Sequence, residues 1–179
     1  MGNLPRCVVA DPGWRPKLHA NTVGRREGKY RAGPQRYYRT MPIEQILALP
    51  APLTQPKAHL WLWCLSQHID WGYMLARTWG FEPQIAVTWA KPGLGTGRFQ
   101  CSTEHVLLGR KGGPVGNAFG ATGGTWFRWP KPPGRVHSAK PDEFYRLVQR
   151  VSPGPYHEMF ARRRREGWTA EGDQLEAAA

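Results

Sequence analysis

Short apolar runs alternate with amphipathic segments along most of the 179 residues of this chain. Residues 6–10 and 58–65 are predicted to be buried strands, because their apolar residues are continuous and too few for a buried helix. The second run, "AHLWLWCL", is typical of a central strand that is covered on both faces. Residues 83–91, 104–112 and 156–163 are predicted to be three further strands.

Three other segments have the spacing and the end signals of helices. Residues 40–50 carry a proline in the first turn and stop at another proline. Residues 69–80 end at a glycine, which is a common helix terminator. Residues 141–151 place apolar side chains at positions i, i+3, i+4 and i+7, so one face of this helix is expected to be buried.

The alternation of strands and helices predicts an α/β fold with a mostly parallel sheet and helices on both of its faces. No internal repeat or domain boundary is evident, so we expect a single domain over residues 1–179, with a polar tail from about residue 170. Residues 15–39 are polar, basic and without periodicity. A loop of this length within a compact domain is usually functional or mobile.

The composition is strongly basic. Lys and Arg total 25 against 13 Asp and Glu, which gives a net charge of +12 and an isoelectric point near 10.2. Such a charge attracts polyanions, so nucleic acid is the expected partner. Aromatic residues lie among the basic ones, as in "TWFRWPK". Rings beside cations can stack on bases while the cations hold phosphates, although most of these rings are expected to be core residues.

Cysteine and histidine usage gives no sign of a disulfide framework or a metal site. The three cysteines are widely spaced, and the six histidines include no H-x-x-x-H pair. No apolar run reaches the length of a membrane span, and the apolar segment near the N-terminus is too short for a secretory signal. We therefore expect a cytoplasmic protein with no metal and no membrane contact.

The glycine-rich stretch "GLGTG", residues 93–97, follows a predicted strand, as a dinucleotide-binding fingerprint does. It lacks the third glycine at the required spacing, and a strand rather than a helix is predicted after it. The Lys-Ser/Thr pair of a phosphate-binding loop is missing as well. A loop near the carboxyl edge of the sheet is therefore the favoured interpretation.

The stretch "ADPGW" follows the first predicted strand, and ligands of open α/β sheets bind beyond the carboxyl ends of strands. Asp11 and the carbonyl of Pro12 could both accept hydrogen bonds from an amino group. Trp14 offers a flat ring on which a base could stack. On these residues alone a simple turn is favoured, since Asp, Pro and Gly each have a turn preference of their own.

A longer set of motifs resembles one protein family. The motifs "ADPGW", "RTMPIEQILALP", "LWLW", "GLG", "HSAKPDEFY" and "PYHEMFARRRREGWTAEGDQL" occur in this order and span most of residues 7–176. They are similar to the S-adenosylmethionine-dependent N6-adenine methyltransferases named after the catalytic subunit of messenger-RNA N6-adenosine methyltransferase, especially the short prokaryotic and phage members. The resemblance implies a Rossmann-like methyltransferase fold with a permuted motif order, in which the catalytic motif precedes the cofactor-binding segments.

The resemblance also implies S-adenosylmethionine as the cofactor and the N6 amine of adenine as the methyl acceptor. Asp11 and the Pro12 carbonyl would accept hydrogen bonds from that amine, and Trp14 would pack against the base. Catalysis would then be mainly positioning, with no metal. The base has to be unpaired or flipped for its N6 atom to be reached.

Further matches to the family imply contacts with the cofactor. Lys140 matches the position that holds the cofactor's carboxylate. Glu158 and Arg162 match positions around the ribose, where carboxylate and guanidinium groups suit hydroxyls, and Phe160 would line the same pocket. The family's Asn-Gln pair near the cofactor's adenine is matched by Asp173 and Gln174.

Two positions depart from the pattern of the family. Gly13 stands where the family has a second proline, and glycine is expected to loosen the turn. Asp173 replaces an asparagine, which removes an amide donor near the cofactor's adenine. Within the arginine run, Arg162 is expected to face the cofactor, whereas residues 163–165 are expected to face solvent or nucleic acid.

The predicted function is methyl transfer to adenine N6 in DNA by a phage or bacterial enzyme. The chain leaves no room for a separate target-recognition domain, so we expect low intrinsic sequence specificity, or a second copy or sister subunit that supplies it. Two alternatives stay open: methylation of RNA, and a non-catalytic relative that binds nucleic acid or acts as a scaffold. The basic residues of the 15–39 loop that would close over the substrate strand are Arg25, Arg26, Lys29, Arg31, Arg36 and Arg39.

Overall fold

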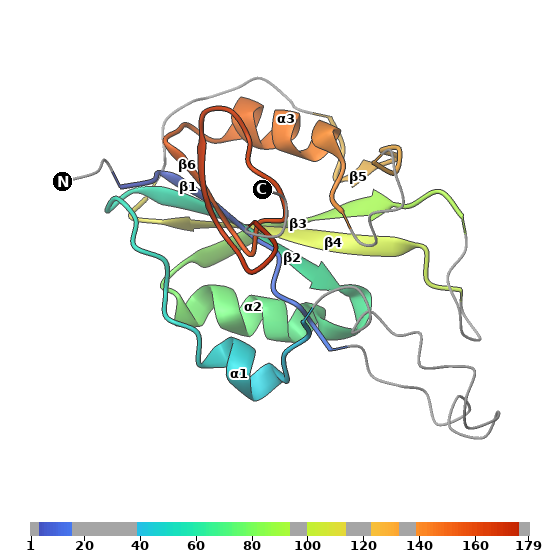
Figure 1. Cartoon of the computed structure of the whole chain (residues 1–179), viewed down its shortest axis with the longest axis horizontal. Helices are drawn as coiled ribbons and strands as arrows, with labels where there is room; N and C mark the ends of the chain where they lie inside the picture. The colour runs from blue at the N-terminus through green and yellow to red at the C-terminus, as the bar shows by residue number, and fades with distance from the viewer. Residues whose placement is uncertain (1–3, 16–38, 94–99, 114–122, 133–138, 176–179) are drawn as a thin grey trace.

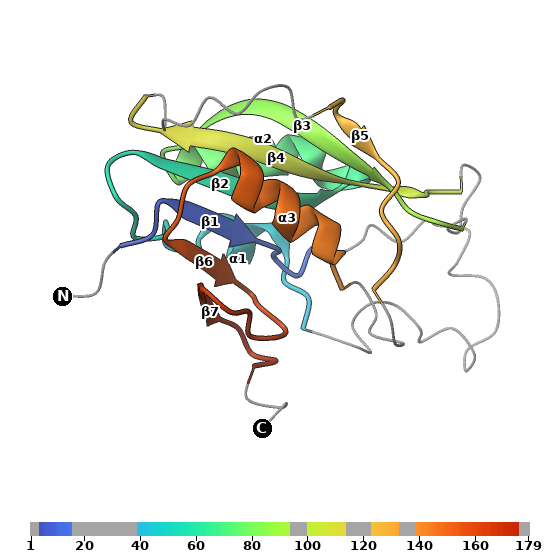
Figure 2. The same cartoon turned by 90° about the horizontal axis from the view of Figure 1, so that it is seen from above.

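The computed structural model describes residues 4–15, 39–93, 100–113, 123–132 and 139–175. Seven strands of this described chain form one sheet in the order β5-β3-β4-β2-β1-β6-β7 (Figure 2). The strands are β1 Cys7–Ala10, β2 Ala58–Leu65, β3 Glu82–Ala90, β4 Thr103–Lys111, β5 Trp126–Phe127, β6 Tyr156–Met159 and β7 Trp168–Glu171. The helices are α1 Ile43–Leu47, α2 Ile69–Thr78 and α3 Asp142–Val151, with a 3-10 turn, η3 Ser66–His68, before α2. No helix in the described ranges is long and apolar enough to cross a lipid bilayer.

The sheet is mostly parallel, as predicted. Parallel pairing joins β1 to β2, β1 to β6, β6 to β7 and β3 to β5. Among the described strands only β4 runs against its neighbours, β2 and β3. The other strands therefore all end at one edge of the sheet, which we call the carboxyl edge, and β4 begins there.

Helices cover both faces of the sheet, which confirms the predicted α/β arrangement (Figure 1). Helices α1 and α2 lie on one face and α3 lies on the other. The side chains of β2 alternate between the two faces and are buried along almost its whole length. Leu60 and Leu62 join the core under α2, whereas Trp61 and Trp63 join the core under α3. This is the doubly covered central strand that the continuous apolar pattern predicts.

The core on the α3 face is built from aromatic rings. Phe144 is fully buried, and its ring centre lies 4.7 Å from that of Trp63 and 5.9 Å from that of Trp61. Both contacts are edge-on, which is a favourable geometry for aromatic pairs. The helix directs this ring inwards because its apolar residues share one face, as the spacing predicts.

Two predictions about the C-terminal region are wrong. The strand predicted over residues 156–163 ends at Met159, because Phe160 has a φ of 60° and turns the chain out of the sheet. The polar tail expected from about residue 170 overlaps a further strand, β7, which the sequence did not reveal because this edge strand alternates half-buried and exposed residues. The loops predicted at residues 15–39 and 93–97 lie largely outside the described residues.

Replacement of Phe144 by alanine is expected to destabilise the fold by about 3–5 kcal/mol, since it removes a buried ring from the aromatic core. Gln149→Ala, on the exposed side of the same helix, should change the free energy of unfolding by less than about 0.5 kcal/mol. Urea denaturation followed by tryptophan fluorescence measures both values. Similar small effects for the two variants would contradict this packing.

Candidate active site

Asp11 and Phe160 lie side by side at the carboxyl edge. Asp11 follows β1 and Phe160 follows β6, and these strands are paired in parallel with Ala10 opposite Met159. Neighbouring strands are only ~4.8 Å apart. The register of β1 and β6 therefore brings together two residues that are far apart in the sequence.

A buried ion network links Asp11 to other elements at this edge. The Nζ atom of Lys140, just before α3, lies 3.1 Å from Oδ2 of Asp11 and 3.0 Å from Oε2 of Glu104. Glu104, near the start of β4, also accepts a hydrogen bond from Nζ of Lys91, with 2.9 Å between Nζ and Oε1. Lys140 is 8% exposed, and its ammonium lies 4.8 Å from the centre of the Trp63 ring. Two carboxylates and two ammonium groups thus alternate across the edge.

Glu104 and Lys140 are held in their charged forms by their neighbours in this network. Burial alone would raise the pKa of Glu104, but Lys140 and Lys91 outweigh burial and lower that pKa from 4.5 to about 2. Burial alone would lower the pKa of Lys140, but Asp11 and Glu104 outweigh it and raise that pKa above its usual 10.5. Lys140 is therefore a fixed cation at neutral pH rather than a proton acceptor.

The Pro12 carbonyl belongs to a tight three-residue turn directly after Asp11. The Trp14 N–H donates to this carbonyl across 2.7 Å. A carbonyl oxygen has two lone pairs, so the turn leaves it able to accept a second hydrogen bond from an amine. A turn and an acceptor site are therefore compatible interpretations of the same motif.

Trp14 is buried rather than open. It is 3% exposed, and its indole N–H donates to the Trp63 carbonyl across 2.7 Å. The His68 ring centre lies 6.0 Å from that of Trp14, and Nε2 of His68 is 2.8 Å from the carbonyl oxygen of Arg15. The sequence suggested that Trp14 offers an open ring face for base stacking, but in the structure this ring is buried. Trp14 instead fixes the turn and lines a narrow space beside Pro12.

The glycine of the motif is required by the chain that packs against it. The Met41 N–H donates to the Gly13 carbonyl across 2.8 Å, and Met41 forms a parallel bridge with Trp14. A Cβ atom on Gly13 would lie 2.3 Å from the carbonyl oxygen of Arg39. Glycine at this position thus permits a close backbone approach, and the turn is held in place rather than loosened.

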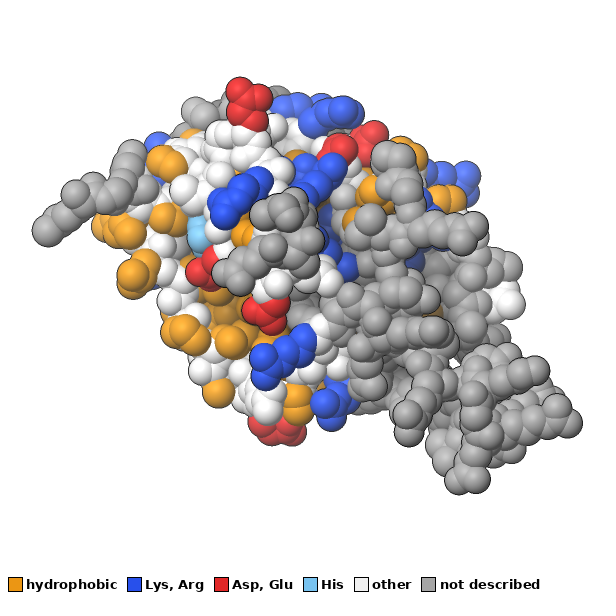
Figure 3. All heavy atoms as spheres, viewed as in Figure 1, with side chains coloured by type: hydrophobic (Ala, Val, Ile, Leu, Met, Phe, Trp, Pro, Cys, Tyr) orange, Lys and Arg blue, Asp and Glu red, His pale blue; other side chains and the backbone are white. Residues whose placement is uncertain are grey.

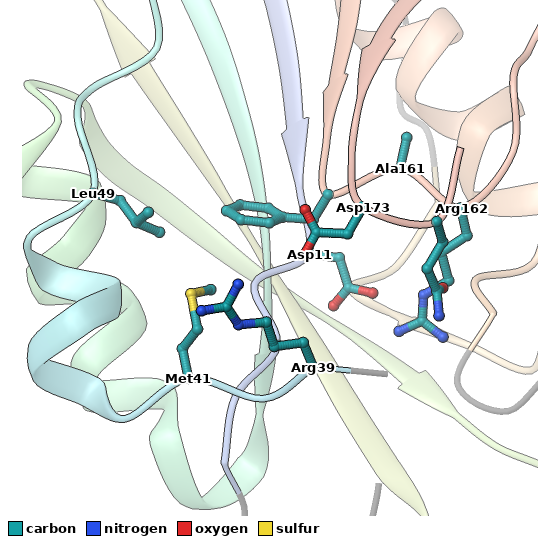
Figure 4. A pocket seen from close by; sticks show the side chains of 10 residues that line it. Asp11, Arg39, Met41, Leu49, Ala161, Arg162 and Asp173 are labelled. Carbon is teal, nitrogen blue, oxygen red and sulfur yellow. The ribbon is translucent and has the colours of Figure 1, made fainter. Parts of the chain in front are cut away.

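A cavity of about 280 Å³ opens beside Asp11 (Figure 4). Met41 and Leu49 lie on one side of it, and Ala161 and Arg162 lie on the opposite side. The other lining residues include the two that match the family's adenine-binding pair and one from the predicted basic loop. They are Gly13, Arg39, Phe160, Asp173 and Gln174.

Strand β7 explains how the segment after Glu171 reaches this cavity. The Ala161 N–H donates to the Glu171 carbonyl across 2.8 Å. A Cβ atom on Gly172 would lie 2.3 Å from the Ala161 carbonyl oxygen, so only glycine permits this contact. Asp173 and Gln174 follow directly and are thereby placed at the cavity.

A second cavity, of about 160 Å³, lies between α3 and the end of β6. Glu158 on its wall is 7% exposed and accepts a hydrogen bond from the Tyr145 hydroxyl across 2.5 Å. Burial raises the pKa of Glu158, and the Tyr145 hydrogen bond and Arg165 only partly offset this. Arg165 covers the Tyr145 ring and lies 3.5 Å from Glu158, so the prediction that it faces solvent is wrong. Arg163 and Arg164 are exposed, as predicted.

Three residues, Asp11, Phe160 and Arg162, line both cavities. A positive φ is uncommon for a bulky side chain such as that of Phe160, and strained backbone of this kind tends to persist at functional sites. The shared wall is thus the place where a molecule filling one cavity would meet groups from the other. We take this wall as the centre of the candidate active site.

The structure brings most of the predicted site residues together. Those found around Asp11 are Pro12, Trp14, Arg39, Lys140, Glu158, Phe160, Arg162, Asp173 and Gln174. Those that lie outside the described residues are Arg25, Arg26, Lys29, Arg31 and Arg36. Glu104 was not predicted as a site residue, although a carboxylate at the start of the apolar stretch "EHVLLG" is a signal for a polar sheet edge.

The lining fits the polar parts of S-adenosylmethionine. The Arg162 guanidinium can donate to ribose hydroxyls, and the Gln174 amide can both donate and accept at an adenine edge. Lys140 has three N–H donors, and its two ion-pair partners leave one for a carboxylate of the cofactor. Within the described ranges, no group of three His, Cys, Asp or Glu side chains is arranged to hold a metal ion.

Glu104→Gln is expected to remove part of the acid sensitivity of the fold. The pKa of Glu104 is about 2 in the folded protein and near 4.5 otherwise, so the unfolded chain binds this proton first as the pH falls. The ionised carboxylate therefore stabilises the fold above pH 4.5, and this contribution of about 3 kcal/mol is lost between pH 4.5 and 2. Denaturation at a series of pH values should show a steeper loss for the wild type than for the variant. Parallel profiles would contradict the pairing.

Gly13→Ala is expected to destabilise the protein by roughly 1–3 kcal/mol, because its Cβ atom would collide with the Arg39 carbonyl. Gly124→Ala is the matched control, since a Cβ atom there meets nothing within 4 Å. The control should change stability by less than about 0.5 kcal/mol in the same thermal or urea unfolding assay. An unchanged Gly13→Ala variant would mean that the backbone approach at Gly13 is not needed.

Comparison with known proteins relates this chain to one family. The family model described as MT-A70 matches residues 5–174. A putative N(6)-adenosine-methyltransferase MT-A70-like protein of Medicago truncatula is 31% identical over 77% of this chain and 24% of its own length. The human N(6)-adenosine-methyltransferase catalytic subunit METTL3 is 29% identical over 94% of this chain and 28% of its own length. An N(6)-adenosine-methyltransferase MT-A70-like protein of Drosophila melanogaster is 29% identical, over 94% and 26% respectively.

The chain spans about a quarter of the length of these curated relatives. They come from a plant, a mammal and an insect, so they lend no support to the expected phage or bacterial origin. The matched residues include both cavities, the ion network and the Rossmann-like sheet that places them at one edge. Because the family model matches residues 5–174, the chain belongs to the MT-A70 family.

Proposed function

We propose that this chain transfers a methyl group from S-adenosylmethionine to the N6 amine of adenosine in RNA. The observation that carries the proposal is the position of Asp11 on the wall shared by two cavities, with the Pro12 carbonyl beside it in a fixed turn. A carboxylate and a carbonyl are the acceptors that an exocyclic amine needs. Membership of the MT-A70 family supports the same chemistry.

Asp11 and Pro12 would act by orienting the amine. When both N–H groups are held by acceptors, the nitrogen lone pair is directed away from them and towards the methyl donor. This fixed orientation of the reacting atoms lowers the barrier to methyl transfer. S-adenosylmethionine, when bound, supplies the methyl group on an electrophilic sulfonium, which is left as a thioether, and the methylated nitrogen releases one proton to solvent. Lys140 pairs with one oxygen of the Asp11 carboxylate, which would limit the rotation of this acceptor when the base enters.

The two cavities would share the cofactor. Gln174 and Asp173, in the larger cavity, would face its adenine, and Arg162 on the shared wall would face its ribose. Lys140 lines the second cavity, where it would meet the cofactor's carboxylate. Glu158 lies in that second cavity too, and its hydrogen bond from Tyr145 makes it a support for the ribose-binding wall.

RNA is proposed as the substrate because the names of the relatives specify adenosine, the ribonucleoside. DNA, the substrate that the sequence first suggested, is then the alternative that an experiment has to separate. The non-catalytic alternative is disfavoured, since Asp11, Lys140 and Arg162 all stand at the cavities with their functional groups intact.

Incubation of the purified protein with labelled S-adenosylmethionine and matched single-stranded RNA and DNA oligonucleotides tests the proposal. We expect N6-methyladenosine in the RNA, identified by nucleoside chromatography. Asp11→Ala should lower the transfer rate roughly 100-fold or more, because the amine loses an orienting acceptor. Asp70→Ala, which removes an exposed acid on α2, is the matched control and should stay within twofold of the wild type.

Each other outcome has a clear meaning. Methyl transfer to DNA alone would replace RNA as the substrate. Binding of S-adenosylmethionine in a calorimeter with no transfer to either nucleic acid would support the non-catalytic alternative. Full activity of Asp11→Ala would refute the role given to that carboxylate.

A further inference from the structure

Trp126 stands exposed on the edge strand β5. It is 54% exposed, and it is the one aromatic residue among the exposed large hydrophobic side chains of the described chain. The guanidinium of Arg128 lies over its ring, 5.2 Å from the ring centre. β5 pairs only with β3 in the described sheet, so this pair of side chains lies at the outer limit of the fold.

The neighbouring residues anchor this exposed pair. Side chains alternate along a strand, and Phe127 and Trp129 point the other way, into the core under α3. Their rings stack with centres 4.7 Å apart, and the Trp89 indole N–H donates to the Trp129 carbonyl across 2.9 Å. The exposed face of Trp126 is therefore carried by a fixed backbone rather than by a free loop end.

The charge around Trp126 suits a polyanion. Residues 123–132 contain two cations and no acid. Nζ of Lys131 lies 3.8 Å from where a Cβ atom of Gly93 would stand, which places a second positive charge at the turn after β3. The acids of β3 and β4 are Glu82 and Glu104, and each is paired with a cation. In the region where Figure 1 labels β5, Figure 3 shows hydrophobic and basic side chains, with acidic side chains next to them.

Trp126 lies on the same edge as Asp11. β1 and β5 both end at the carboxyl edge, with β2, β4 and β3 between them. At ~4.8 Å per interstrand spacing, the two sites are roughly 20 Å apart along this edge. This is about six nucleotides at ~3.4 Å per stacked nucleotide, a length that one single strand can span.

We propose that Trp126 and Arg128 form a stacking platform for a base of the substrate strand, several nucleotides from the adenosine whose N6 is methylated. The platform rests on the proposed function, since the strand it holds is the one that enters the site. An exposed ring beside a cation binds any base through its face and the adjacent phosphate through its charge, with little sequence preference. Among the described residues, the exposed apolar surface here is one ring beside Arg128 and the short side chain of Thr88, which is too small a patch to suit a folded protein partner.

The platform is tested by measuring RNA affinity in a fluorescence competition assay. Two RNAs with one adenine each are compared, a trinucleotide and a pentadecamer that carries the adenine at its centre. Trp126→Ala should weaken pentadecamer binding roughly tenfold, which is typical of one lost stacked base, and should narrow the affinity gap between the two lengths. Trp126→Phe should restore most of the loss because it keeps a ring. Arg128→Gln should reduce the slope of log affinity against log salt by about 0.7, since one phosphate contact is lost.

Tyr73→Ala is the matched control, because Arg77 lies over the Tyr73 ring on α2, 5.8 Å from its centre. It should leave both affinities within twofold of the wild type. Equal losses for the trinucleotide and the pentadecamer in Trp126→Ala would overturn the platform, as would unchanged pentadecamer binding. Weaker self-association of Trp126→Ala in sedimentation, with RNA affinity unchanged, would assign the ring to a protein contact and also overturn it.

The test separates the platform from the proposed function. Length-dependent loss of binding in a protein that methylates no nucleic acid would support the platform and refute only the proposed activity. Methylation of RNA by a protein whose Trp126→Ala variant binds the pentadecamer normally would support the activity and refute only the platform.

Discussion

The Lys140 ammonium, held between Asp11 and Glu104, is the contact on which the rest of the site depends. It joins three elements that are distant in the sequence: the end of β1, the start of β4 and the beginning of α3. A buried cation is costly unless it is fully paired, and removal of one partner leaves the others uncompensated. The aromatic face of Trp63 beneath the ammonium adds a further attraction. The site is therefore charged and stiff before any ligand enters, which is what catalysis by positioning requires.

The sheet determines which residues can join that network. Cores on both faces fix the register of β1, β2 and β6, so the residues that follow these strands have little freedom. Phe160 is forced out of the sheet directly after β6 and forms the wall between the two cavities. β7 then returns the chain so that Asp173 and Gln174 reach the same wall. The sheet thus brings acids, arginines and an amide to one edge, from the segments after β1, before α1, after β6 and after β7.

The sequence predicts the parts of this arrangement that depend on local pattern. Continuous apolar runs mark β1 and β2, and helical spacing marks α3, because burial on both faces or on one stripe leaves a strong periodic signal. β5 and β7 leave almost none, since they are short edge strands with exposed side chains. The pairing of Lys140 with Glu104 depends on strand order and register, which no single stretch of residues encodes. The residues proposed to hold a cofactor were predicted through family resemblance, and the cavities that they line follow from the fold.

Gly13 shows how a local departure from a family pattern can have a non-local cause. If only its own turn is considered, a glycine in place of a proline loses more conformational entropy on folding, which suggests a weakened site. The structure shows instead that glycine is required at this position, because the Arg39 carbonyl occupies the space that any Cβ atom would need. The turn is also fixed, since the Met41 N–H donates to the Gly13 carbonyl. On the other side of the motif, His68 holds the Arg15 carbonyl. Arg15 and Arg39 are the described residues that flank the basic segment 16–38. The Arg15 carbonyl is held by His68, and Arg39 lines the cavity beside Asp11, so both ends of this cationic stretch are anchored to the motif that follows β1.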